Sequence, residues 1–262
     1  KQTCMQCRVK AMANHFNKYN ALASYSNLFI TILSALILVP IIESSVGKNY
    51  YGIYQFVYSL AVYSELMSLG LGKTVERYVA KYSQEEKKDK ESATVSIAFS
   101  IYIVTGILYL TGCGILYWQF GNIFNFSADE IEIARTCFLI AALNAVLNVP
   151  ASLFFYHLRG RGRFTFVFNM GTAKAILRVL IILLILRFGF GLAALFVVEL
   201  ILVQSVNLVY AYMSLMKYKL SLQMFYFDRE LFKKLSQYTA YVFLIGIAGL
   251  LYWNTDNIIL GI

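Results

Sequence analysis

The chain has 262 residues, of which 59% are hydrophobic and 14% are charged, and its formal net charge is +9. Soluble domains carry about 45–50% apolar and about 25% charged residues, so too few charges remain here to cover the surface of a soluble enzyme. The abundance of apolar residues also excludes a disordered chain. We therefore expect an integral membrane protein, in which a basic balance reflects membrane topology and not nucleic-acid binding.

Apolar runs of about 20 residues, the length that crosses the hydrocarbon core, occur seven times. They are continuous and not alternating, which predicts α-helices instead of a membrane β-barrel. The short link Phe188–Phe190 predicts an antiparallel hairpin, and Ser127 and Glu130 have the spacing of a capping box. Pro40 is expected to end or kink the first span, and Pro150 is expected to kink the fourth. The expected spans are Ala21–Ile42, Tyr51–Leu71, Ala93–Trp118, Ile133–Tyr156, Phe166–Leu186, Gly191–Met216 and Tyr238–Leu260.

The spans predict an all-α integral membrane fold with a six-helix transmembrane bundle and the first helix of a second lobe. The chain starts at Lys1 instead of Met and stops directly after an apolar run, so we expect both ends to be cut. The expected segments are an N-terminal segment (1–20), an N-terminal lobe (21–216), a linker (217–237) and the first helix of a truncated second lobe (238–262).

The basic residues near the span ends predict the orientation. With the N-terminus inside, the segments on the cytoplasmic side carry 18 Lys and Arg residues, whereas the outer loops carry only Lys48 and Arg187. Cytoplasmic loops of membrane proteins are enriched in Lys and Arg. We therefore expect a multi-pass protein whose N-terminus and linker are cytoplasmic.

Ionisable residues within spans are costly unless they meet a partner or water, so they indicate function. Lys174 and Arg178 are four residues apart on one helix face and repel each other unless an anion lies between them. Two interpretations stay open: a structural ion pair with Glu65 or Glu199, or an anion site in an aqueous cavity. The ionisable residues of the spans are Glu65, Arg135, Lys174, Arg178, Glu199 and Asp256.

Polar side chains at helical spacing form a narrow stripe on the first span. Such a stripe provides either hydrogen bonds between helices or one wall of a hydrated cavity. We expect the cavity, which amides in the fourth and sixth spans would extend. The stripe consists of Asn20, Ser24, Asn27, Thr31 and Ser34, and the amides are Asn144, Asn148, Gln204 and Asn207.

No motif for catalysis, a metal or a cofactor stands out in the sequence. Cys4 and Cys7 form a lone C-x-x-C without a second pair, which is weak evidence for a zinc or redox site. His15 and His157 lie at opposite ends of the six-span block, and no carboxylate pair is evident. We therefore expect a protein that is not an enzyme and that binds neither a metal nor a cofactor.

Four sequence landmarks, in this order along the chain, carry a family resemblance. From about Asn20 to Ile262 the chain resembles the polysaccharide and O-antigen flippases of the multidrug/oligosaccharidyl-lipid/polysaccharide exporter superfamily. The landmarks are Gly47-Lys-Asn-Tyr-Tyr-Gly-Ile-Tyr-Gln55, the segment Leu69–Tyr82, Gly162-Arg-Phe-Thr-Phe166, and Tyr252-Trp-Asn-Thr-Asp-Asn-Ile-Ile-Leu-Gly261.

The resemblance implies a two-lobed transporter of the bacterial cytoplasmic membrane with a cationic cavity between two six-helix lobes. Such proteins move undecaprenyl-pyrophosphate-linked oligosaccharides across the membrane by alternating access for surface polysaccharide biosynthesis. Its partners would be the lipid-linked oligosaccharide, a coupling ion (proton or sodium) and membrane lipids. This chain would hold the N-terminal lobe and the first helix of the C-terminal lobe.

On this resemblance we assign roles to the polar residues of the spans and loops. Arg161 belongs to the basic loop Arg159–Arg163, which would collect an anionic headgroup or only anchor the topology. The alternatives are a lipid II flippase, a multidrug cation exporter, which would need an acidic cavity, or a non-transporting membrane protein of glycan assembly. The expected substrate-binding residues are Arg178, Lys174, Arg135, Asn27, Thr31 and Arg161, and the expected ion-coupling residues are Glu65, Glu199 and Asp256.

Overall fold

The computed structural model describes the backbone of residues 2–62, 68, 70–124, 127–223 and 226–260. Side chains are described from residue 18 to residue 248, apart from 61–67, 69, 125–126, 128–129, 224–225 and 247. Within these residues every regular element is a helix, and 5 helices are long and apolar enough to cross a membrane. The expected all-α membrane fold is confirmed.

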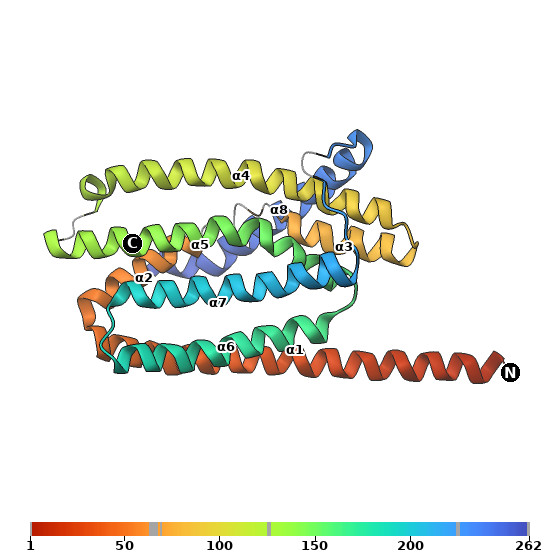
Figure 1. The fold of residues 1–262 in the computed structure, drawn as a ribbon, viewed down its shortest axis with the longest axis horizontal. Coiled ribbons are helices and arrows are strands. Elements are labelled where there is room, and N and C mark those ends of the chain that lie inside the picture. Colours follow the sequence, from red (N-terminus) through yellow and green to blue (C-terminus); the bar gives the residue numbers. More distant parts are fainter. Residues whose placement is uncertain (1, 63–67, 69, 125–126, 224–225, 261–262) are drawn as a thin grey trace.

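The described helices form an elongated bundle whose long axis most of them follow (Figure 1). The helices α4, α5, α7 and α6 follow one another across the bundle in this view, α1 lies against α6, and α8 crosses behind the bundle. The elements are α1 (Gln2–Val46), α2 (Lys48–Val62), α3 (Leu71–Gln84), α4 (Lys88–Ile123), α5 (Ala128–Gly160), α6 (Phe164–Arg187), α7 (Leu192–Tyr212), the π-helical turn η2 (Met213–Lys217) and α8 (Arg229–Leu260).

Tight turns join neighbouring helices at both ends of the bundle. The expected hairpin at Phe188–Phe190 is confirmed, because α6 ends at Arg187 and α7 begins at Leu192. Gly162 and Gly189 adopt left-handed conformations with φ of 73° in the α5–α6 and α6–α7 turns, a region that glycine enters without strain. We call the end that holds α3, the start of α4 and the α5–α6 turn the basic end.

The helix signals in the sequence are only partly confirmed. The capping box at the start of α5 is present, with the Ser127 amide donating to the Glu130 carboxylate at 3.1 Å. Pro40 does not end its helix, because α1 continues to Val46, and α5 likewise continues past Pro150. Both prolines therefore lie inside helices that continue beyond them.

The expected second span, Tyr51–Leu71, is not described as one continuous helix. The helix α2 is described to Val62, and α3 starts at Leu71 after a turn at Gly70 with φ of 70°. Residues 63–67 and 69, which include Glu65, lie outside the described residues. A left-handed residue breaks α-helical geometry, so the polar helix α3 begins where the apolar run stops.

Two apolar cores hold the bundle together. One packs α1 and α2 against α4, α5 and α7 around Phe120, Phe138 and Ile42. The other lies near the basic end and packs α3 and α4 against α5 around Tyr102 and Leu153. Large apolar side chains also face outward, and their exposure is typical of helices that contact lipid.

The first turns of α8 pack on α3 and α4 at the basic end. Leu231 and Leu235 of α8 are buried against Tyr82 and Ile97. The Thr74 and Thr239 hydroxyls lie 2.9 Å apart. The helix expected to begin the second lobe is therefore joined to the first lobe by a small apolar core and polar contacts.

Close approach of α5 to α3 depends on Gly160. A Cβ atom at this position would lie 2.7 Å from the Glu76 carbonyl oxygen and 2.8 Å from Val79 Cβ. Gly160→Ala is therefore expected to destabilise the protein by about 1–3 kcal/mol through overpacking. The measurement is the thermal unfolding midpoint of the full-length protein in detergent. Gly112→Ala in α4, where no atom lies within 4 Å of the added Cβ, is the matched control, and an equal effect of the two substitutions would contradict the packing argument.

Candidate functional site

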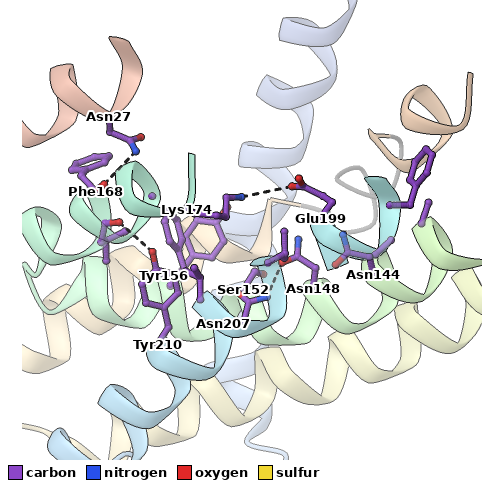
Figure 2. Close-up of a pocket in the computed structure, with 18 of the residues that line it drawn as sticks. Asn27, Asn144, Asn148, Ser152, Tyr156, Phe168, Lys174, Glu199, Asn207 and Tyr210 are labelled. Carbon is purple, nitrogen blue, oxygen red and sulfur yellow. Dashed lines mark hydrogen bonds and ion pairs between the residues drawn. The ribbon is translucent and has the colours of Figure 1, made fainter. Parts of the chain in front are cut away.

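A cavity of about 510 Å³ opens between α1, α2, α5, α6 and α7. This volume is in the range of about 300–1,000 Å³ that small-molecule sites occupy. Figure 2 shows amide, hydroxyl and charged side chains converging on it from α1, α5, α6 and α7. The polar lining residues are Asn27, Tyr58, Asn144, Asn148, Ser152, Tyr156, Lys174, Glu199, Asn207 and Tyr210.

One carboxylate on α7 meets Lys174 and Arg178 of α6 beside the cavity. Glu199 lies 2.9 Å from Arg178 Nε and 3.9 Å from Lys174 Nζ. Arg178 also donates to the Tyr54 hydroxyl at 3.4 Å. The structure therefore contains the ion pair with Glu199 that the sequence left open, and the trio keeps a net charge of +1. Lys174 and Glu199 line the cavity, whereas Arg178 is not among its lining residues.

Four amide side chains join α5 to α7 along the cavity wall. Gln204 donates to the Asn144 side-chain oxygen at 2.9 Å, and Asn207 donates to that of Asn148 at 3.0 Å. Asn207 also donates to Gln204 at 3.4 Å, which links the two pairs. Each amide carries two donor hydrogens and an oxygen with two lone pairs, so this network retains donors and acceptors for a ligand.

The polar stripe of α1 mainly joins α1 to α6. Asn27 donates to the Phe168 carbonyl at 3.2 Å and to the Thr172 hydroxyl at 3.3 Å. Asn20 accepts hydrogen bonds from the backbone and side chain of Thr165. A Cβ at Gly171 would lie 2.6 Å from Asn27 Nδ2, so the glycine makes this approach possible. Asn27 both bonds α6 and lines the cavity.

Of the expected substrate-binding residues, only Asn27 and Lys174 line the cavity; Arg178 lies next to Glu199 but does not line it, and Thr31 and Arg135 do not line it either. The structure leaves Thr31 exposed, on a part of α1 that does not line the cavity. Arg135 lies over the ring of Tyr117 on α4, 5.6 Å from its centroid, and its buried Nε has no hydrogen-bond partner among the described residues. Sequence spacing shows which residues share a helix face, but not what packs against that face, so it could not show this.

The arginines of the α5–α6 turn are engaged within the bundle. Arg161 donates to both oxygens of the Glu91 carboxylate at 2.6 Å, and Arg159 lies 3.2 Å from Glu76. Burial raises the pKa of Glu76, although the Arg159 guanidinium opposes that shift. Arg163 donates to the Tyr218 hydroxyl. The structure therefore does not bring Arg161 to the cavity.

Two of the expected ion-coupling residues fall outside the described side chains. Glu65 lies in the segment 63–67, and Asp256 lies in the part of α8 for which only the backbone is described. Glu199 is the member of that set that the structure places, and it lies at the cavity.

A row of cations on α3 contrasts with the paired arginines of the turn. Lys73, Arg77 and Lys81 are spaced four apart, so they share one face of α3, and all three are exposed. Arg77 stacks on the ring of Tyr238 of α8 at 4.2 Å. Among the side chains that the structure describes, none of the three forms an ion pair with a carboxylate. The row therefore offers positive charge to an external anion.

Sequence reasoning missed a buried polar cluster at the basic end. Glu91 falls in a charge-rich run, so nothing in the sequence distinguishes it from its solvated neighbours, yet it is 2% exposed. His157 looks like an interfacial histidine by position but is fully buried against Glu91 and Ser214. Arg159 and Arg161 lie within four residues of His157 in the sequence, but arginines near a histidine at the end of a membrane span are too common to have indicated the cluster.

The lining of the cavity indicates the kind of ligand that it could bind. Within the described residues, no group of three or more His, Cys, Asp or Glu side chains is placed to hold a metal ion. The amides, the tyrosine hydroxyls and one net positive charge suit a ligand that is rich in hydroxyl groups and anionic.

Comparison with known proteins places the chain in a family. The model of the family described as "Polysaccharide biosynthesis protein" matches residues 19–262. No curated protein sequence matches the chain.

Solved structures of transporters share the fold. An outward-facing multidrug resistance MATE family transporter of the MOP superfamily superposes with a TM-score of 0.70 and 15% identity over 86% of this chain and 51% of its own. A MOP superfamily transporter from Pyrococcus furiosus gives 0.71 and 14% over 86% and 51%, and a MATE mutant gives 0.70 and 16% over 87% and 52%. The chain thus spans about half the length of these transporters.

The ion trio generates a testable ranking of coupling energies. Residues in direct contact show interaction energies of about 0.5–3 kcal/mol in double-mutant cycles. We expect the Arg178→Gln and Glu199→Gln cycle to give a larger coupling energy than the Lys174→Gln and Glu199→Gln cycle, because the first contact is 2.9 Å and the second 3.9 Å. The measurement is chemical unfolding of the full-length protein in detergent. A reversed ranking would mean that Lys174 is the principal partner of Glu199.

Proposed function

The chain belongs to the polysaccharide biosynthesis protein family, and on that premise we propose that the whole protein is a flippase for lipid-linked oligosaccharides. It would move an undecaprenyl-pyrophosphate-linked oligosaccharide across the bacterial cytoplasmic membrane by alternating access for surface polysaccharide biosynthesis. The single observation that carries this proposal is the cavity, where an amide network and Lys174 line the wall beside a charged trio whose net charge is +1.

The cavity meets the physical problem that such a substrate poses. Sugar hydroxyls and phosphate oxygens lose hydration inside an apolar bundle, and each unpaired polar group costs about 1–3 kcal/mol in proteins. Asn144, Asn148 and Asn207 offer donors and acceptors to hydroxyls, and Lys174 offers a charge to a phosphate. Because Arg178 already pairs closely with Glu199, Lys174 is the member of the trio that a ligand would engage.

We assign the capture of the anionic headgroup to α3 instead of the α5–α6 turn. The arginines of the turn are held by Glu76, Glu91 and Tyr218, whereas the cations of α3 form no ion pair among the described side chains. Three like charges on one helix face repel one another, so an anion that binds between them is favoured. In the expected topology this row lies on the cytoplasmic side, where the substrate would enter.

The lobe also contains a candidate for ion coupling. Glu199 is the carboxylate of the cavity, and its two cations hold it within the bundle. Substrate phosphate that draws Lys174 away would leave Glu199 less compensated and ready to accept a proton or sodium ion. Glu65 and Asp256 remain candidates from the sequence for the same role.

The alternatives differ in the charge that their cavity requires. A multidrug cation exporter would need an acidic cavity, and the net charge of +1 in the trio disfavours it. A lipid II flippase would use the same phosphate and sugar chemistry. Assays with lipid II and with a lipid-linked oligosaccharide as substrates distinguish the two functions. A membrane protein that assembles glycans without transport would transfer sugars without exchange between leaflets.

Lys174→Gln in the full-length protein tests the cavity. In liposomes that contain the lipid-linked oligosaccharide, we expect at least a roughly tenfold lower rate of exchange between leaflets, because a charge-assisted hydrogen bond is worth about 1.5–3 kcal/mol. Lys174→Arg should retain part of the rate, and Lys48→Gln at the exposed start of α2 is the control. An unchanged rate for Lys174→Gln at equal protein level would refute the cavity site, and sugar transfer without exchange would favour an enzyme.

The α3 row has a test of its own. Lys73→Gln with Lys81→Gln should raise the substrate concentration for half-maximal exchange several-fold and weaken its dependence on salt, since exposed charges steer anions by a screened interaction. Lys88→Gln with Lys90→Gln removes the same charge from exposed positions at the start of α4 and should have a smaller effect. Equal effects of the two double substitutions would show that only net charge matters.

A further inference from the structure

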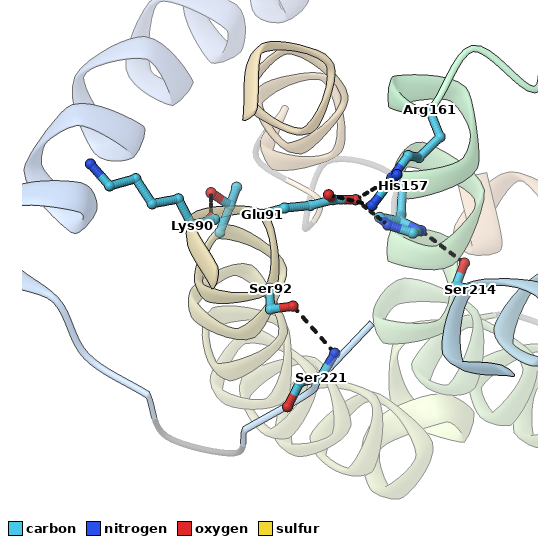
Figure 3. Close-up of polar contacts among 8 residues, drawn as sticks. Lys90, Glu91, Ser92, His157, Arg161, Ser214 and Ser221 are labelled. Atoms are coloured by element: carbon cyan, nitrogen blue, oxygen red, sulfur yellow. Dashed lines mark hydrogen bonds and ion pairs between the residues drawn. The ribbon is translucent and has the colours of Figure 1, made fainter. Parts of the chain in front are cut away.

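A polar cluster, buried except for part of Arg161, joins three parts of the chain at the basic end (Figure 3). Glu91 of α4 accepts hydrogen bonds from Arg161, which directly follows α5, at 2.6 Å to each carboxylate oxygen, and lies 2.7 Å from His157 Nε2 of α5. His157 Nδ1 lies 3.0 Å from the hydroxyl of Ser214, which belongs to the π-helical turn η2. The cluster therefore connects α4, the end of α5 and η2.

The hydrogen bonds of the cluster are mutually consistent. Arg161 holds Glu91 as a carboxylate, which only accepts hydrogen bonds, so His157 Nε2 carries the hydrogen that faces it. In the neutral ring, Nδ1 then accepts the Ser214 hydroxyl. His157 and Ser214 are 0% exposed, so no solvent replaces a lost partner. Removal of one member would leave a buried polar atom unpaired.

A segment after this turn lies along α4 as a strap. We define the strap as residues 220–223; Tyr218, before it, belongs to the anchored side, because its hydroxyl accepts a hydrogen bond from Arg163 and its ring contacts His157. The Ser92 hydroxyl accepts from the Ser221 amide at 3.2 Å, and the Ser96 hydroxyl accepts from the Gln223 amide at 3.0 Å. Leu220 is buried in the core of α3, α4 and α5. Two neutral hydrogen bonds join the strap to α4, the Leu220 amide donates to the Ser214 carbonyl at 3.1 Å, and the side chains of Leu220 and Leu222 pack on the core.

Unusual backbone geometry is concentrated between the cluster and the strap. The turn η2 has π-helical geometry, which often marks functional positions. Lys219 adopts a left-handed conformation with φ of 51°, which is costly for a residue with a side chain. The strong contacts therefore lie before this strained joint and the weak contacts lie after it.

We infer that the cluster of Glu91, His157, Arg161 and Ser214 is the fixed anchor of a releasable strap, which leaves α4 during the transport cycle. This inference rests on the proposed function, because the strap leads to α8, the expected first helix of a second lobe. Alternating access moves one lobe against the other, so the connection between lobes must yield. It yields at the strap, because the strap bonds α4 through two neutral hydrogen bonds, whereas the anchor is held by charge-assisted hydrogen bonds to the Glu91 carboxylate.

The first experiment measures docking of the strap without any transport assay. Ser221→Cys is introduced into the full-length protein in detergent after the native cysteines are replaced, and the rate of its reaction with a maleimide is followed. Ser214→Ala and Glu91→Gln should each raise that rate at least threefold, because they loosen the anchor. Thr111→Ala, at an exposed site on α4, is the control. Rates unchanged by both anchor substitutions, at normal protein yield, would overturn the anchor role.

The second experiment locks the strap. The pair Ser92→Cys and Ser221→Cys places two thiols where a hydroxyl and a backbone nitrogen lie 3.2 Å apart, which is favourable for a disulfide. Oxidation should reduce leaflet exchange at least tenfold, a reductant should restore it, and each single cysteine should be insensitive. Equal exchange in the oxidised and reduced pair would overturn the inference. If the reduced protein exchanges nothing, the proposed function fails instead, while the maleimide rates still test the anchor.

Discussion

A charged side chain inside an apolar membrane bundle costs several kcal/mol unless a partner or water meets it. Among the described residues, two carboxylates each lie within ion-pair distance of two basic side chains from a different part of the chain. Glu199 meets Lys174 and Arg178 at the cavity, and Glu91 meets Arg161 and His157 at the basic end. These two centres fix how α6 lies against α7 and how α4 lies against α5, so both the cavity and the strap depend on them.

Pairing with a carboxylate also separates the basic residues that stabilise the fold from those that are available to bind an external anion. A cation that is already held by a carboxylate contributes to the fold and has little capacity left for a ligand. Arg159 and Arg161 are of this kind. The row on α3 is not paired among the described side chains, so its charge is available to an anion outside the bundle. Whether a basic residue lacks a carboxylate partner within the bundle is therefore a better guide to anion binding than whether it lies near the membrane surface.

Small residues set how closely polar groups approach one another. Gly171 lets Asn27 of α1 reach α6, and Gly160 lets the end of α5 lie on α3. Hydrogen bonds between membrane helices need such close backbone approach. The amides of α5 and α7 then face each other across the cavity wall at hydrogen-bond distance, which makes one network from residues about 60 positions apart in sequence.

The sequence by itself determined the membrane class, five of the helices, the hairpin at Phe188–Phe190 and the capping box at Ser127, because hydropathy and local hydrogen bonding suffice for these. It also placed Lys174, Glu199 and the amides in the spans that form the cavity. Only the tertiary structure decided that Thr31, Arg135 and Arg161 lie away from it and that Glu91 and His157 are buried together. Periodicity gives the face of a helix, but the neighbour that packs on that face decides which polar groups meet.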